Sequence, residues 1–147
     1  MKISTKGRYG VRFMLDLALH GDGEALSLND IAHRQAISEK YLWQVVNPLK
    51  SAGLVTVTRG AKGGFMLTRE PALVTLKDIL DAVEGDSVLV DCVSVPEKCK
   101  RRGECVMQGV WSELTQKISE AMRSITLQSI VERQKLMERD TALDYVI

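Results

Sequence analysis

The sequence predicts a mainly α-helical fold with a small β-hairpin wing, a winged helix-turn-helix domain followed by a long C-terminal helix. Three observations predict this class. Two short helical patterns flank a tight turn near residue 37, a glycine-rich hairpin pattern covers about 54–68, and apolar residues recur at helical spacing over about 108–126. The 147 residues, 45% of them hydrophobic, are enough for one domain with an appended element.

The first helix is expected over about 5–20. Tyr9, Phe13 and Leu17 lie four residues apart, which places them on one apolar face of a helix. Residues 21–23 are Gly-Asp-Gly, a combination that favours a turn, so the helix should end there.

Ser27 and Ser38 are the expected N-caps of the next two helices. Ser27 and Asp30 have the spacing of a capping box, in which Asp30 reaches back to the start of the helix. After Ser38 an apolar stripe follows helical spacing, and Pro48 should bend or loosen this helix before it ends at Gly53. The stripe consists of Tyr41, Leu42, Val45, Val46 and Leu49.

A basic β-hairpin comes next, followed by one more helix. Residues 54–58 and 65–68 alternate in polarity and are rich in strand-forming types, and a glycine-rich tip joins them. Thr75 and Asp78 have the spacing of another capping box, and Gly85 should close the helix that this box opens.

The rest of the chain is expected to form a polar, irregular segment at 91–107 and a long amphipathic helix. A short segment around 127–131 and a polar tail follow this helix. The expected parts are therefore a winged helix-turn-helix domain, a cysteine-bearing loop, a long helix with a short following segment, and a polar tail, at 1–84, 85–107, 108–131 and 132–147.

The composition excludes several classes of protein. The net charge is only +1, but residues 1–70 contain ten Lys and Arg against six Asp and Glu, so positive charge is concentrated in the first half. No apolar run approaches the roughly 18 residues of a membrane span. Residues 1–6 lack the apolar stretch of a secretory signal, which predicts a cytoplasmic protein. No catalytic triad, phosphate loop or pair of catalytic carboxylates is recognisable, so we do not expect an enzyme.

The helix after Ser38 and the hairpin tip carry residue types that contact DNA. Side chains near the N-terminus of such a helix can contact base edges in the major groove, where glutamine pairs with adenine and glutamate accepts from cytosine. Cations and glycines in the tip suit phosphate contacts. The alternative is a helix-turn-helix used for protein contacts. The candidate DNA-binding residues are Ser38, Glu39, Lys40, Tyr41, Trp43, Gln44, Arg59, Gly60, Lys62 and Gly64.

The three cysteines of the chain, Cys92, Cys99 and Cys105, lie within 14 residues. Their odd number and their gaps of six and five residues disfavour a disulfide framework and a Cys-x-x-Cys dithiol. Three thiolates from one polar loop can face a common centre, which favours an iron–sulfur cluster, zinc or copper(I). Redox-active thiols without a metal are the alternative. The candidates for a fourth ligand are His20, His33, Asp91, Glu104 and Gln108.

Four motifs resemble those of the IscR/NsrR/CymR family of winged-helix transcription regulators. They are STKGRYG at 4–10, SEKYL at 38–42, AGLV at 52–55 and RGAKGGF at 59–65. Their order and separation match over roughly residues 1–130. The resemblance implies a repressor or activator that is a homodimer, associates through the helix at about 108–126, and binds a palindromic operator in double-stranded DNA. It also implies the iron–sulfur branch of the family, with a 2Fe–2S or 4Fe–4S cluster on Cys92, Cys99 and Cys105.

Three positions depart from the pattern of this family. IscR-like proteins usually have histidine where this chain has Gln108, and an acidic residue is common where it has Trp43. Relatives that sense nitric oxide can use a carboxylate at the position of Arg8. Cluster type and fourth ligand therefore stay open, and the recognised DNA sequence is expected to differ.

The resulting hypothesis is a cytoplasmic transcription regulator whose operator affinity is controlled by an iron–sulfur cluster that responds to iron–sulfur status, redox or nitric oxide. The alternative is a metal- or thiol-based redox carrier, or interaction protein, that uses its winged helix for protein contacts.

Overall fold

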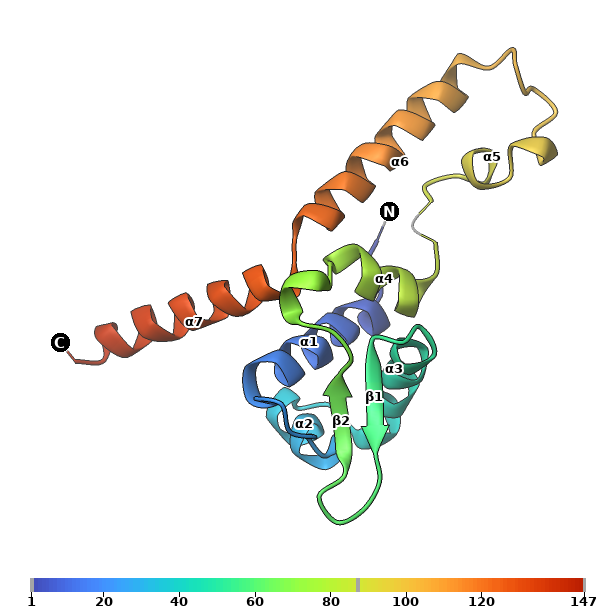
Figure 1. The fold of residues 1–147 in the computed structure, drawn as a ribbon. Coiled ribbons are helices and arrows are strands. Elements are labelled where there is room, and N and C mark those ends of the chain that lie inside the picture. The colour runs from blue at the N-terminus through green and yellow to red at the C-terminus, as the bar shows by residue number, and fades with distance from the viewer. Residues whose placement is uncertain (1, 87, 147) are drawn as a thin grey trace.

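The computed structural model describes residues 2–86 and 88–146. It confirms a mainly helical fold with a two-stranded wing (Figure 1). One compact body contains the first four α-helices and the hairpin, and two long helices project from it in different directions. The elements in order are α1 (Thr5–His20), α2 (Leu28–Gln35), α3 (Glu39–Ser51), β1 (Val55–Thr58), β2 (Gly64–Leu67), η1 (Pro71–Leu73), α4 (Leu76–Glu84), α5 (Asp91–Ser94), η2 (Pro96–Lys98), α6 (Val106–Ser124) and α7 (Leu127–Asp144).

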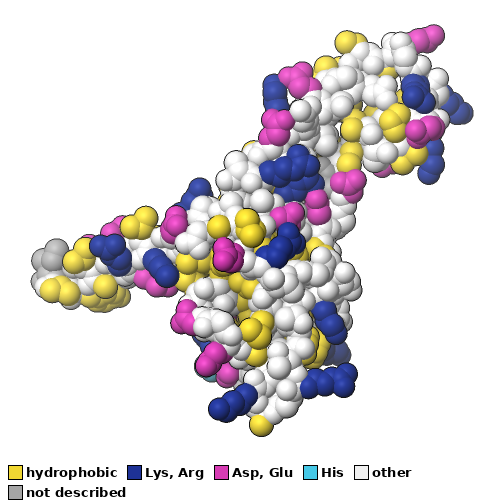
Figure 2. Space-filling view, viewed as in Figure 1, with side chains coloured by type: hydrophobic (Ala, Val, Ile, Leu, Met, Phe, Trp, Pro, Cys, Tyr) yellow, Lys and Arg dark blue, Asp and Glu magenta, His cyan; other side chains and the backbone are white. Residues whose placement is uncertain are grey.

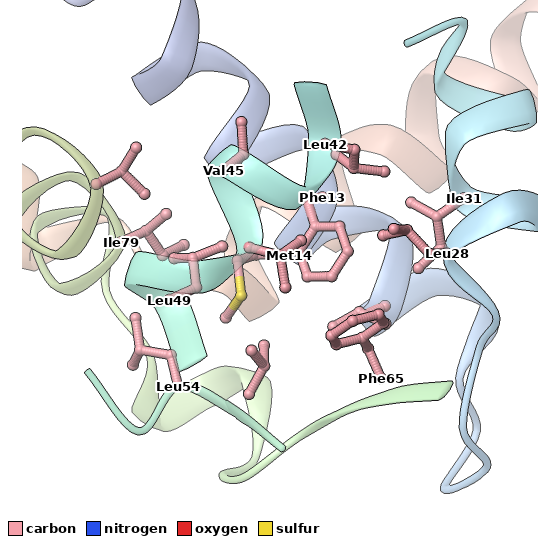
Figure 3. Close-up of a cluster of buried hydrophobic side chains, with 14 of the residues drawn as sticks. Phe13, Met14, Leu28, Ile31, Leu42, Val45, Leu49, Leu54, Phe65 and Ile79 are labelled. Carbon is pink, nitrogen blue, oxygen red and sulfur yellow. The ribbon is translucent and has the colours of Figure 1, made fainter. Parts of the chain in front are cut away.

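A single aliphatic and aromatic core fills the body (Figure 3). Phe13 and Met14 of α1 are completely buried against the apolar face of α3. The apolar stripe expected on α3 is confirmed, since its four aliphatic members are buried. Its fifth member, Tyr41, is half-buried, and its ring lies edge-on to the ring of Tyr9, with 5.6 Å between the ring centroids. Because this packing buries one face of α3, the opposite face of the helix lies in solvent. The four aliphatic members are Leu42, Val45, Val46 and Leu49.

Side-chain caps begin the helices where the sequence placed them. The hydroxyl of Ser38 accepts a hydrogen bond from the backbone N–H of Tyr41 at 3.3 Å, and α3 then continues through Pro48 to its end at Ser51. In α2 the Asp30 carboxylate accepts a hydrogen bond from the hydroxyl of Ser27 at 2.7 Å. The contact of Asp30 with the start of the helix, which the capping-box spacing predicted, is therefore made to the side chain of Ser27. The complete capping box forms in α4, at Thr75 and Asp78.

The wing is an antiparallel hairpin that is also attached to the segment before α2. Val55 pairs with Leu67 and Thr58 with Gly64 at the two ends of the ladder. Leu26 forms an isolated bridge with Phe65, in which each backbone N–H donates to the other residue's carbonyl, at 3.0 and 2.8 Å. Because of this bridge, β2 is held on both sides, and the position of the wing relative to the helix-turn-helix is fixed.

The C-terminal third contains more helix than the sequence predicted. The segment expected to be irregular includes α5 and η2, and proline at the start of η2 suits the first turn of a helix. α7 continues to Asp144, where we expected a short segment and a polar tail. Thr126 caps α7, and Leu127 and Val131 are buried. Side-chain hydrogen bonds four residues apart, such as Gln134 to Glu138 at 2.8 Å, support its polar part.

Within residues 2–86 and 88–146, no helix is both long enough and apolar enough to cross a membrane.

Candidate DNA interface and cysteine segment

The outer face of α3 presents the candidate base-contacting side chains to solvent. Lys40 is exposed, as are Trp43 and Gln44, which follow it by three and four residues, so all three lie outside the buried stripe of α3. Ser38, the cap residue, and Tyr41, half-buried against Tyr9, contribute mainly to holding this helix in place. The structure therefore brings most of the predicted residues of α3 to one open face.

Glu39 has a second role that the sequence did not reveal. Its carboxylate accepts a hydrogen bond from the side-chain amide of Asn29 at 2.6 Å. This bond links the first turn of α3 to the first turn of α2, so it helps to fix the angle between the two helices. One carboxylate oxygen of Glu39 is thereby engaged, and the other is open to a further donor.

A buried carboxylate in α1 orients α2, and sequence reasoning missed it. Asp16 is completely buried and lies 2.6 Å from a guanidinium nitrogen of Arg34. The side-chain amide of Gln35 also donates to Asp16, at 2.8 Å. The hydrogen bond with Asp16 raises the pKa of Arg34, against the opposing effect of burial. The available signal was a charged residue between the apolar positions Met14 and Leu17 of an amphipathic helix.

The tip of the wing carries the two predicted cations. Arg59 and Lys62 are exposed, and Figure 2 shows Lys and Arg side chains on both sides of the hairpin tip. Gly60 has a backbone φ of +108° with open space around its Cα, so its role is to turn the chain. Gly64 has a different role, because a Cβ there would lie 2.2 Å from the carbonyl oxygen of Leu26.

α6 has an unusual amount of exposed apolar surface for a helix of a single chain. Val106 is 80% exposed, Val110 45% and Leu114 41%, and all three belong to the first half of α6, a helix that projects from the body (Figure 1). Exposed apolar side chains repeated at three- to four-residue spacing along one helix are typical of a helix that packs against another subunit.

The three cysteines lie between α4 and α6, and each thiol is free and half-buried. Cys92 is in α5, Cys99 follows η2, and Cys105 is the residue before the first turn of α6. Across the described parts of the chain, no three His, Cys, Asp or Glu side chains are close enough together to hold a metal ion. The segment thus supplies three thiols without a preassembled metal site.

The candidates for a fourth ligand lie in different parts of the molecule. The side-chain amide of Gln108 donates to the backbone carbonyl of Cys92 at 3.0 Å, which ties the first turn of α6 to α5. Asp91 and Glu104 are exposed on the cysteine segment itself. His20 and His33 are exposed on α1 and α2, in the winged-helix body. Of these five residues, all of which the structure describes, Gln108 is the one whose side chain hydrogen bonds to a cysteine residue.

Comparison with known proteins gives a consistent result. A family model described as Rrf2, iron-dependent transcriptional regulator, matches residues 3–133. The chain is 41% identical over 131 residues to the HTH-type transcriptional regulator CymR of Bacillus subtilis, covering 88% of this chain and 89% of that protein. The solved structure of B. subtilis CymR, the global cysteine regulator, has a TM-score of 0.75 at 37% identity, covering 90% of this chain and 98% of the other. The structure of T. potens IscR has a TM-score of 0.72 at 40% identity, with coverages of 91% and 88%.

Proposed function

The chain belongs to the Rrf2 family of transcriptional regulators, and from this premise we propose that it is a homodimeric, cytoplasmic DNA-binding regulator whose operator affinity depends on an iron–sulfur cluster. The observation that carries DNA binding is the open face of α3 beside a basic wing. The resemblance of the chain to regulators of both the IscR and the CymR type supports the same function.

Each part of the interface has a distinct task in this proposal. Lys40 and Gln44 on α3 contact base edges in the major groove, and Gln44 can pair with adenine through both amide atoms. Arg59 and Lys62 in the wing contact phosphates, which position the protein without distinguishing sequences. The Asn29–Glu39 hydrogen bond and the buried Asp16 carboxylate hold α2 and α3 at the angle that the groove requires.

The exposed apolar face of α6 supports a homodimer. Burying Val110 and Leu114 against the same residues of a second copy would remove this surface from water. A two-fold dimer presents two α3 helices to half-sites about 34 Å apart, which explains the expectation of a palindromic operator. The dimer arrangement therefore determines the operator affinity of the protein.

The chemistry of the three cysteines fits an iron–sulfur cluster. Thiolates are the ligands that such clusters prefer, and the segment carries three of them without a partner. A bound cluster would supply redox and nitric-oxide reactivity at this place. The segment itself contacts α6 through Gln108 and Cys92, so a change in its conformation can reach the helix that joins the two subunits. Lys98, Lys100 and Arg101 would offset the negative charge of the thiolates.

Anaerobic reconstitution with iron and sulfide, followed by operator selection from a random duplex pool, tests the proposal. We expect brown protein with charge-transfer absorbance, which Cys99→Ser abolishes and the neighbouring control Ser94→Ala preserves. Operator affinity measured with and without the cluster should differ at least tenfold in the wild type and not in Cys99→Ser. Colourless protein that still binds its operator would refute the cluster and leave DNA binding intact.

Thiol oxidation without a metal is the second candidate for the control of affinity. It is favoured by the free, half-buried state of all three cysteines and by the dispersal of the thiols in the structure. A solved structure of Staphylococcus aureus CymR, 32% identical, is described as an oxidized form. In this case peroxide should change operator affinity in iron-free protein, and dithiothreitol should restore it.

A further inference from the structure

Three aromatic rings connect the core of the body to the outer face of α3. Phe13 of α1 lies edge-on to Phe65 of β2, with 5.8 Å between ring centroids and 79° between ring planes (Figure 3). Phe65 in turn lies edge-on to Trp43 of α3, at 5.6 Å and 74°. These are favourable geometries for aromatic pairs. This series of three rings therefore links α1, the wing and α3.

Exposure increases along this series. Phe13 is completely buried, Phe65 is 3% exposed and Trp43 is 44% exposed. Phe65 cannot move easily, because its backbone N–H and carbonyl both hydrogen bond to Leu26, and β1 pairs with the other side of its strand. The indole of Trp43 therefore rests on a rigid support while almost half of it faces solvent. An apolar group held in this way loses little conformational entropy when it is buried by a ligand.

We propose that Trp43 recognises the C5-methyl group of a thymine in each half-site of the operator, an inference that rests on the DNA-binding function proposed above. In the major groove, the methyl group of thymine is the apolar feature among the donors and acceptors of the base edges. Trp43 offers an apolar surface at this place, beside Lys40 and Gln44 on the exposed side of the same helix. Phe65 is a positioning residue that holds the indole against the groove.

The test uses an operator selected from a random duplex pool by the cluster-loaded protein. Each thymine of the half-site is then replaced in turn by deoxyuridine, which removes only the methyl group, and affinity is measured by fluorescence anisotropy at fixed salt. At one position the wild type should lose about fourfold, the equivalent of the ~0.8 kcal/mol gained by burying one methylene-sized group. Trp43→Ala should bind more weakly and show less than about a 1.5-fold effect of deoxyuridine at that position.

Matched variants separate methyl recognition from general damage. Trp43→Phe keeps an apolar ring and should retain part of the methyl effect. Phe65→Leu keeps a buried apolar side chain but removes the supporting ring, and should reduce the methyl effect while the far-ultraviolet circular dichroism stays unchanged. Lys62→Ala should weaken binding to every duplex alike and leave the methyl effect at about fourfold.

Three results would overturn the proposal. One is a tightly bound operator in which no deoxyuridine replacement changes affinity by more than about 1.5-fold. Another is a Trp43→Ala variant that keeps the full methyl effect. A protein that selects no duplex at all would overturn the DNA-binding function itself, and this inference with it, whereas the first two results leave DNA binding in place.

Discussion

The carboxylate of Asp16 is completely buried in α1 and lies 2.6 Å from the guanidinium of Arg34 in α2, whose side chain is 34% exposed. A second nitrogen of Arg34 lies 3.1 and 3.2 Å from the two carboxylate oxygens, so the pair is held by several hydrogen bonds. An ionised carboxylate without partners is costly in a protein interior. The pair therefore adds an ionic contact to the apolar packing that holds α2 against α1.

Arg34→Ala should lower the free energy of unfolding by about 3 kcal/mol, at the lower end for a broken buried pair, because Gln35 still donates to Asp16. Since the hydrogen bond raises the pKa of Arg34, the stabilisation is present below the ordinary pKa of arginine and spans the neutral range. Urea unfolding at one protein concentration measures the change. The control Arg8→Ala, at an exposed site, should stay within about 0.5 kcal/mol. A similarly small change in Arg34→Ala would show that the pair does not stabilise the fold.

Gly64→Ala should destabilise the protein by about 2 kcal/mol or more, because the added Cβ would lie 2.2 Å from the carbonyl oxygen of Leu26. That oxygen belongs to the bridge that attaches the wing, so operator binding should weaken as well. Gly60→Ala is the matched control in the same hairpin, with positive φ but open space, and should cost only about 1 kcal/mol. Urea unfolding of both variants measures the two losses in free energy of unfolding. Equal losses in both variants would rule out the close contact as the cause.

Most of the winged-helix body could be predicted from local patterns. Ser38 begins α3 and Gly85 follows the end of α4 as expected, because caps act on neighbouring backbone groups. The bridge between Leu26 and Phe65 could not be predicted, since it joins residues about forty positions apart. The length of α7 was also missed, because its later part has little apolar periodicity and is supported by side-chain hydrogen bonds such as that of Gln134 to Glu138.

The candidate site could be predicted in composition but not in detail. The sequence showed which residues of α3 and of the wing are polar or cationic, and the structure places Lys40 and Lys62 in solvent. It did not show that Glu39 bonds to Asn29 or that Gly64 lies against the backbone of Leu26, because both depend on tertiary contacts. The spacing of the cysteines likewise predicts ligand chemistry without fixing where each thiol lies.

Lys62→Ala should make the salt dependence of DNA binding shallower by about one unit in the slope of log Kobs against log salt, because one phosphate contact is lost. Affinity should fall to a similar degree for every duplex sequence. Anisotropy titrations over a range of potassium chloride concentrations measure the slope. Lys135→Ala removes another exposed charge, from α7 and not from the wing, and should leave the slope unchanged. If Lys62→Ala leaves it unchanged too, the wing does not contact phosphate at this residue.

Leu114→Glu should convert the protein to a monomer. Leu114 of α6 is 41% exposed, and a two-fold dimer through this helix would bury it together with its counterpart. The substitution places two carboxylates at the contact, and desolvating them opposes association. Because Leu114 is exposed and is not part of the core cluster, the circular dichroism spectrum should be unchanged, while sedimentation velocity shows half the mass. Operator affinity should fall at least tenfold, since a monomer contacts one half-site.

Glu113→Gln is the control, because Glu113 is exposed and pairs with Lys117 on its own helix at 2.5 Å. A Leu114→Glu variant that still sediments as a dimer would place the subunit contact on another surface.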